Sequence, residues 1–161
     1  MASKQIKKGS YTVGVISDTH GLIRPEVLDA FKDTDLIIHA GDIGNPDVLK
    51  RLKKIAPVKA VRGNMDGGEW SYELPASDIV EIGEILIYVL HDVDDLDLDP
   101  FDTGVQLVIS GHAHRPSSEY KSGVLFLNPG TAGPFRPPVT VALLSINGKS
   151  IEPNFIDLMD R

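Results

Sequence analysis

Residues 11–20 read YTVGVISDTH, an apolar run rich in β-branched side chains that ends abruptly in polar residues. This pattern predicts a buried β-strand over about residues 11–17. On extended backbone, residues two apart point to the same side, so we expect Asp18 and His20 to address one point in space. A carboxylate and an imidazole aimed together form a metal-ligand pair. For this segment alone, the alternative is a helix-capping Asp beside a surface His.

Similar apolar strand patterns recur later in the sequence. Strands are expected over residues 36–40 and 58–61, and each is preceded by an expected helix, at about 25–32 and 46–54. This alternation predicts a parallel sheet that is covered on both faces. The second half is expected to be mostly β, with a hairpin turn at Asn147-Gly148. Its expected strands lie at about 78–82, 84–90, 106–110, 117–121, 124–127, 139–146 and 149–157.

Length and composition narrow the class of protein. The 161 residues fit one domain with a real core. A net charge of −7 argues against a general nucleic-acid-binding surface, and the lack of cysteine excludes a thiolate zinc site. No run approaches the roughly 18 apolar residues of a membrane span. Residues 1–10 are basic and polar, so we expect a flexible tail before a domain over 11–161, in a cytoplasmic protein.

Five of the expected strands are each followed by side chains that can bind metal. These are Asp18 with His20, then Asp42, Asn64, His91, and finally His112 with His114. Ligands of open α/β sheets lie beyond the carboxyl ends of the strands, so the fold is expected to collect these side chains at one edge. Singly, Asp42 and Asn64 read equally well as turn residues after glycine, and His91 as a strand-end histidine. His39 lies within a strand and is expected to be packed rather than to bind metal.

The whole pattern resembles the calcineurin-like metallophosphoesterase superfamily. It runs Asp18-x-His20, Gly41-Asp42, Gly63-Asn64, His91 and Gly111-His112-x-His114. The chain length and the closing Asn128-Pro129-Gly130-Thr131 resemble its compact YfcE-type phosphodiesterase branch. The resemblance covers about residues 11–157. It implies an α/β fold in which two mixed β-sheets form a sandwich flanked by helices, in a single domain.

The resemblance also implies a site with two divalent metal ions. Asp18, His20, Asp42 and His114 would hold one ion, and Asp42, Asn64, His91 and His112 the other, with Asp42 bridging. Oxygen and imidazole ligands suit Mn²⁺, our first expectation, or Ni²⁺, Fe²⁺ or Zn²⁺. A hydroxide bridging the metals would attack phosphorus, with Asp42, Asn64 and His91 as catalytic residues. Asn64 and Arg62 are expected to contact substrate.

Two positions depart from the family pattern. After the His91 position the family continues with Gly and a second His, where this chain has Asp92-Val93. Many members carry His directly after the Gly-Asn, where this chain has Met65. Without a histidine as general acid, esters with acidic leaving groups, such as aryl phosphodiesters, are expected to be the better substrates. The acidic run from Asp92 to Asp99 is either a solvated loop or helix start, or places a carboxylate near the second metal.

The expected function is therefore a metal-dependent phosphodiesterase that acts on a small phosphoester and forms a homo-oligomer, with no nucleic-acid or membrane partner. Two alternatives stay open. One is a phosphomonoesterase or nucleotidase on the same site, and the other is a non-catalytic metal-binding interaction scaffold of the same fold. Three aromatic residues near loops, Trp70, Tyr72 and Phe101, could cover an aryl group or simply pack.

Overall fold

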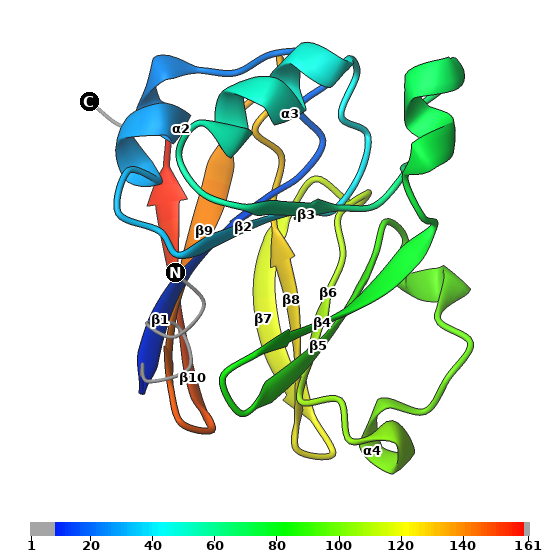
Figure 1. Cartoon of the computed structure of the whole chain (residues 1–161), viewed down its shortest axis with the longest axis vertical. Helices are drawn as coiled ribbons and strands as arrows, with labels where there is room; N and C mark the ends of the chain where they lie inside the picture. The colour runs from blue at the N-terminus through cyan, green and yellow to red at the C-terminus, as the bar shows by residue number, and fades with distance from the viewer. Residues whose placement is uncertain (1–8, 160–161) are drawn as a thin grey trace.

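Two five-stranded β-sheets, packed face to face, form the protein (Figure 1). The structure is a computed structural model and describes residues 9–159. In order across the first sheet, the strands are β10 (Ser150–Asp157), β9 (Thr140–Asn147), β1 (Ser10–Ile16), β2 (Leu36–His39) and β3 (Val58–Ala60). Across the second sheet they are β4 (Ser77–Ile82), β5 (Ile85–Leu90), β6 (Leu107–Ile109), β8 (Val124–Pro129) and β7 (Pro116–Lys121). The α/β sandwich of two mixed sheets implied by the family resemblance is confirmed.

Each sheet contains three neighbouring parallel strands. β1, β2 and β3 run parallel in the first sheet, and β5, β6 and β8 run parallel in the second. The remaining strands pair antiparallel with their neighbours. The core between the sheets is built from alternate residues, such as Val13 and Val15 of β1 against Ile87 of β5 and Leu107 of β6. This period of two is what a half-buried strand requires.

The two longer helices cover the outer face of the first sheet. They are α2 (Pro25–Ala30) and α3 (Pro46–Lys53), at the top of the view in Figure 1. The Asn45 side chain caps α3 by accepting a hydrogen bond from the Asp47 amide at 2.9 Å, and Leu52 of α3 packs into the core beneath. The first sheet is therefore covered on both faces as expected, but its inner face is covered by the second sheet and not by helices.

The outer face of the second sheet is covered by an irregular segment between β5 and β6. It contains the 3₁₀ turn η2 (Val93–Asp95) and the short helix α4 (Pro100–Thr103). Asp92 and Asp99 cap these turns, accepting from the amides of Asp94 at 3.0 Å and Phe101 at 3.0 Å. The helix-start interpretation of the acidic run is thus confirmed for these two residues.

The expected strands and the two main helices are confirmed, with ends that differ by one or two residues. A second 3₁₀ turn, η1 (Glu69–Glu73), was not expected from the sequence. Of the predicted tail, residues 1–8 lie outside the described residues, and Ser10 already begins β1. No helix in the described part of the chain is long and apolar enough to cross a membrane.

Candidate metal centre

The polar residues predicted to bind metal converge where the carboxyl ends of both sheets meet. Backbone hydrogen bonds join the loops: the Asp18 amide donates to the Gly41 carbonyl at 3.0 Å, and the Gly111 amide donates to the His91 carbonyl at 2.9 Å. The sequence predicted that these residues would meet at one edge of one sheet, but they meet between the two sheets. The loops after β1, β2 and β3 come from the first sheet, and those after β5 and β6 come from the second. Two clusters of side chains form there.

The first cluster brings Asp18, His20 and His114 together, with one ligand atom of each within 4.8 Å of the others. Nε2 of His114 lies 3.3 Å from Oδ1 of Asp18, which is fully buried. The other oxygen of Asp18 accepts hydrogen bonds from the Ser17 hydroxyl at 2.6 Å and the His112 amide at 3.0 Å. These two bonds fix the carboxylate so that Oδ1 faces the imidazoles.

The second cluster brings Asp18, Asp42 and His91 together, again with one ligand atom of each within 4.8 Å of the others. Oδ2 of Asp42 lies 3.3 Å from Nε2 of His91 and 3.5 Å from Nε2 of His20, while its Oδ1 accepts from the Met65 amide at 2.8 Å. The Nδ1–H of His91 donates to the Ala40 carbonyl at 2.8 Å, which directs Nε2 toward the carboxylates. One oxygen of Asp42 therefore faces an imidazole of each cluster.

The donor atoms of these clusters fit divalent cations. Among the described residues, Oδ1 of Asp18, Nε2 of His20 and Nε2 of His91 are buried without a hydrogen-bond partner. Buried polar atoms are normally paired, so three ligand atoms without a hydrogen-bond partner in one place indicate a site that fits a cation. Carboxylate and imidazole donors without thiolate suit Mn²⁺, Fe²⁺, Ni²⁺ or Zn²⁺.

The charges at the centre agree with this fit. Burial alone would raise the pKa of Asp42, but the neighbouring His91 imidazole and the hydrogen bond from the Met65 amide outweigh it and hold the pKa below its usual value. Burial alone would lower the pKa of His91, but the neighbouring Asp42 carboxylate and the hydrogen bond to the Ala40 carbonyl outweigh that and raise the pKa. The negative potential that favours a proton on His91 would also favour a divalent cation.

The backbone conformation of the ligand loops differs from the prediction. Asp18 and His20 were expected on extended backbone, but their φ angles are 57° and 48°, in the left-handed region. Asp42, His112 and His114 share this conformation, with φ of 55°, 70° and 62°. Only six non-glycine residues of the described chain have a positive φ, and these are five of them. Such backbone costs roughly 1–3 kcal/mol at each residue and is concentrated at functional sites.

This conformation also separates the last pair of histidines. On extended backbone, residues two apart would present both imidazoles to one side, but His112 and His114 go to different clusters. The ring of His114 lies 6.2 Å from that of His20, and the ring of His112 lies 5.2 Å from that of His91. The strongly turned backbone separates the two rings, consistent with the division that the family resemblance implies.

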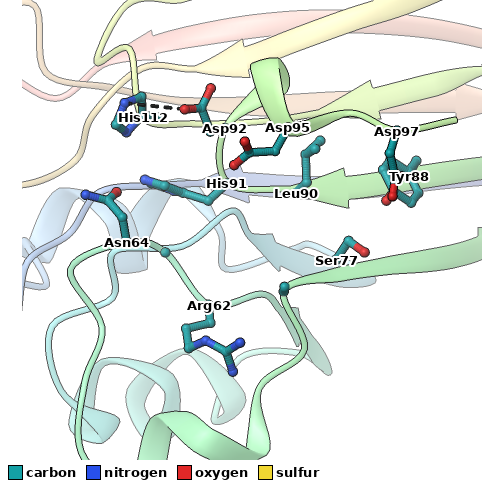
Figure 2. Close-up of a pocket in the computed structure, with 12 residues that line it drawn as sticks. Arg62, Asn64, Ser77, Tyr88, Leu90, His91, Asp92, Asp95, Asp97 and His112 are labelled. Atoms are coloured by element: carbon teal, nitrogen blue, oxygen red, sulfur yellow. Dashed lines mark ion pairs between the residues drawn. The ribbon is translucent and has the colours of Figure 1, made fainter.

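A cavity of about 360 Å³ opens beside the second cluster (Figure 2). Asn64, His91 and His112 line one end of it. Nε2 of His112 lies 3.6 Å from Oδ2 of Asp92, so the structure places this carboxylate beside the second cluster, as one of the two sequence interpretations expected. Asn64 is exposed at the mouth.

The arginines near the centre are bonded to backbone carbonyls. Nη1 of Arg62 donates to the Leu74 carbonyl at 2.7 Å, and Nη2 of Arg24 donates to the Gly133 carbonyl at 3.0 Å. Arg62 lines the cavity, yet its guanidinium points away from His91 and Asn64 in Figure 2. Arg115 is exposed. The predicted substrate contact at Arg62 would require its guanidinium to leave Leu74.

The aromatic residue that touches the centre was not predicted. The ring of Phe135 lies 5.0 Å from that of His20 and 4.5 Å from that of His114. Tyr72 and Phe101 are exposed away from the cavity lining, and Trp70 packs against the core under the helices. Phe135 carries no pattern in the sequence, because it lies in a loop that only the fold brings to the first cluster.

Other supporting residues were only partly signalled by the sequence. The carboxylate of Asp66 accepts from the amides of Gly44 at 3.0 Å and Gly63 at 2.9 Å, which ties two ligand loops together. In the closing Asn128–Thr131 motif, the Thr131 hydroxyl donates to the Asp18 carbonyl at 2.9 Å. The Asn128 amide donates to the Gly111 carbonyl at 2.8 Å.

The remaining histidine is structural. His39 is fully buried, accepts a hydrogen bond at Nδ1 from the Gly41 amide at 3.1 Å, and bonds through Nε2 to the Thr19 hydroxyl at 3.0 Å. Because the Thr19 hydroxyl donates to the Ile43 carbonyl, Nε2 of His39 must carry the donated proton. The prediction that His39 is packed within its strand is confirmed.

A sandwich of two mixed sheets, with carboxylate and histidine clusters at the strand ends, defines the class as a metallohydrolase fold. Residues 12–149 match the family model of the calcineurin-like phosphoesterase superfamily domain, and the chain belongs to this family. A curated relative, a "probable metallophosphoesterase" of Methanothermobacter thermautotrophicus, is 36% identical over 159 residues, which cover 89% of this chain and 91% of the relative. The family predicted from the motifs is thereby confirmed.

Solved structures of low sequence identity share the fold. An archaeal phosphodiesterase has a TM-score of 0.76 at 24% identity, covering 90% of this chain and 99% of its own. The phosphoesterase YfcE of Escherichia coli has a TM-score of 0.65 at 21% identity, covering 91% and 99%. Vacuolar protein sorting 29 of Cryptosporidium parvum has a TM-score of 0.75 at 20% identity, covering 92% and 98%. These likenesses concern the fold alone.

Proposed function

We propose that this protein is a phosphodiesterase that works with two divalent metal ions, Mn²⁺ first among them. The observation that carries the proposal is Oδ2 of Asp42, which faces His20 of one cluster and His91 of the other within 3.5 Å. Two divalent ions, when bound, would supply Lewis acidity that activates water and would orient a phosphoryl group for in-line attack. Asp18, His20 and His114 would hold one ion, and Asn64, His91 and His112 the other, with Asp42 shared.

The protein's own residues prepare this chemistry. The Ala40 carbonyl orients His91, and the Met65 amide orients Asp42, so neither ligand has to reorganise on binding metal. Asn64 lines the cavity and would donate its amide protons to a phosphoryl oxygen. We assign the catalytic roles to Asp42, Asn64 and His91, and substrate contact to Asn64 and Arg62.

The charge around the centre favours a diester over a monoester. A phosphomonoester carries up to two negative charges, whereas a diester carries one. Arg24 and Arg62 both donate to carbonyl oxygens, and the cavity is lined by three carboxylates, at Asp92, Asp95 and Asp97. A second negative charge on the substrate would meet little positive charge beyond the metals, so the diester is the better match.

The test compares bis-p-nitrophenyl phosphate with p-nitrophenyl phosphate as substrates under Mn²⁺, Ni²⁺, Fe²⁺ and Zn²⁺ in turn. The proposal expects a higher kcat/KM for the diester and loss of turnover with chelator. Faster hydrolysis of the monoester would favour the phosphomonoesterase alternative. Tight metal binding without hydrolysis of either ester would favour the interaction scaffold.

The proposal extends to the setting of the enzyme. A net charge of −7 supports a small phosphoester substrate rather than nucleic acid. We place the protein in the cytoplasm as a homo-oligomer. Sedimentation of the purified, metal-loaded protein would measure its self-association.

A further inference from the structure

One wall of the cavity beside the metal centre is acidic. Asp92, Asp95 and Asp97 line it, while His91 and His112 line the end next to the metal centre (Figure 2). His91 is only 6% exposed, and its Nε2 has no hydrogen-bond partner among the described residues. That nitrogen faces Oδ2 of Asp42 at 3.3 Å and belongs to the metal centre, so a phosphoester held at the centre would have its ester group in the same cavity as the three carboxylates.

The fold holds these carboxylates in place. Leu96 and Leu98 pack against the hydrophobic cluster on the outer face of the second sheet, which includes Tyr88 and Leu90. The intervening Asp97 and the preceding Asp95 line the cavity instead. The alternation of leucine and aspartate thus anchors the segment on one side and presents negative charge on the other.

Little positive charge offsets this wall. Arg62 is the permanent cation of the lining, but its guanidinium is bonded to the Leu74 carbonyl and points away from the aspartates in Figure 2. Asp92 faces His112 at 3.6 Å. Within the described chain, the carboxylates of Asp95 and Asp97 form no ion pair. Tyr88, Leu90 and Ala76 add apolar surface to the same cavity.

We propose that this cavity binds a cationic ester group, so that the favoured substrates are phosphodiesters of a small ammonium alcohol such as choline or ethanolamine. The proposal rests on the phosphodiesterase function proposed above. An ammonium group needs anionic and apolar neighbours together, and the cavity offers both. One water is consumed as one P–O bond breaks, giving a phosphomonoester and an alcohol, and the alkoxide takes its proton from solvent.

The test compares two diesters that differ only in charge. They are p-nitrophenyl phosphorylcholine and p-nitrophenyl 3,3-dimethylbutyl phosphate, in which a carbon atom replaces the ammonium nitrogen. On the Mn²⁺-loaded protein, kcat/KM for the choline diester is expected to be about tenfold higher, because exposed ion pairs each contribute a factor of about two to five. Replacing Asp95 and Asp97 together by Asn should reduce this ratio to about two.

The matched control is Asp94→Asn. Asp94 lies in the same acidic segment and is exposed, but it does not line the cavity. This variant should keep the tenfold ratio, which separates a local effect of the cavity from a change in net charge. A wild-type ratio near one, or equal losses of the ratio in the Asp94 and the Asp95/Asp97 variants, would overturn the proposal.

Two further measurements separate a failure of this proposal from a failure of the proposed function. If neither diester is hydrolysed, the proposed function fails, and calorimetric binding of phosphorylcholine against 3,3-dimethylbutyl phosphate still tests the cavity. Equal affinities would overturn the proposal, and tighter binding of phosphorylcholine that Asp95→Asn weakens would support it. The ratio of the two kcat/KM values should not depend on the Mn²⁺ concentration. If it falls to one as the Mn²⁺ concentration is raised, the carboxylates bind metal ions instead, and the proposal is overturned.

Discussion

Oδ2 of Asp42 lies 3.3 Å from Nε2 of His91, and the two side chains are 4% and 6% exposed. The carboxylate comes from the loop after β2 in the first sheet, and the imidazole from the end of β5 in the second. Their contact therefore depends on how the two sheets are packed. Because Oδ2 also faces His20 at 3.5 Å, a change at Asp42 affects both clusters together.

The first prediction concerns the shared carboxylate. Asp42→Asn keeps the size of the side chain and leaves Oδ1 able to accept from the Met65 amide, but it removes the negative charge. We expect Mn²⁺ affinity and diester turnover to fall by at least about a hundredfold, at the upper end of the loss seen on removing a partner of a metal ligand. Titration calorimetry and kcat for bis-p-nitrophenyl phosphate measure the two effects.

The matched control is Asp29→Asn, because the Asp29 side chain is 82% exposed and its ion pair with Lys32 is a surface contact. This variant loses the same charge and should bind Mn²⁺ as the wild type does. Wild-type Mn²⁺ affinity in the Asp42 variant would contradict the bridging role.

The second prediction concerns stability. The centre gathers Asp18, Asp42 and four imidazoles, so a bound cation should stabilise the folded state over the unfolded state. At a free metal concentration of a hundred times Kd, the gain is about 2.7 kcal/mol. For a domain of this size that corresponds to a rise in Tm of roughly 5–10 °C. Thermal unfolding with Mn²⁺ and with excess chelator measures it, and a chelator already saturated with metal is the control. An unchanged Tm would count against a folded-state metal site.

The sequence was sufficient to locate the centre because the ligands follow strands whose apolar pattern is clear. Val13 and Val15, for example, predict β1 without ambiguity, and Asp18 follows directly. The order of the motifs then identified the family and, through it, the second sheet. Neither step needed knowledge of side-chain contacts.

The sequence did not reveal how the metal-ligand side chains are oriented. The left-handed backbone at Asp18 and His20 is imposed by hydrogen bonds to the neighbouring loop, such as that from the His20 amide to the Asp42 carbonyl at 3.0 Å. Local preference alone disfavours that conformation in non-glycine residues. Phe135 and Asp66 were missed for the same reason, since their roles arise from contacts between segments distant in the chain.

The third prediction concerns the pH dependence of stability. Burial lowers the pKa of His39 from 6.5 to about 3. Between these values the unfolded chain binds a proton that the folded chain does not, so His39 makes the protein less stable as the pH falls from about 6.5 toward 3. The loss is about 1.4 kcal/mol per pH unit, or roughly 2 kcal/mol at pH 5.

Urea unfolding of the metal-free protein at pH 7.5 and pH 5 measures this loss. In His39→Gln the contribution is absent, so the difference between the two pH values should be smaller than in the wild type by roughly 2 kcal/mol. The variant should be less stable at pH 7.5, because the Gly41 amide loses its acceptor at His39 Nδ1. The same pH dependence in both proteins would show that His39 is not the group responsible.

The last prediction concerns the missing general acid. Met65 occupies a position where many family members carry histidine, and its side chain is 67% exposed, so a histidine can be introduced there without disturbing the core. In the wild type, aryl phosphodiesters should be hydrolysed much faster than alkyl phosphodiesters, because the leaving group departs unassisted. Met65→His should raise the kcat of alkyl diesters by up to about a hundredfold and change that of aryl diesters little, since only the poorer leaving group needs a proton.

Met65→Gln is the control, because it is polar but cannot supply a proton. Comparable alkyl and aryl rates in the wild type, or an equal gain with glutamine, would exclude proton donation as the limiting factor.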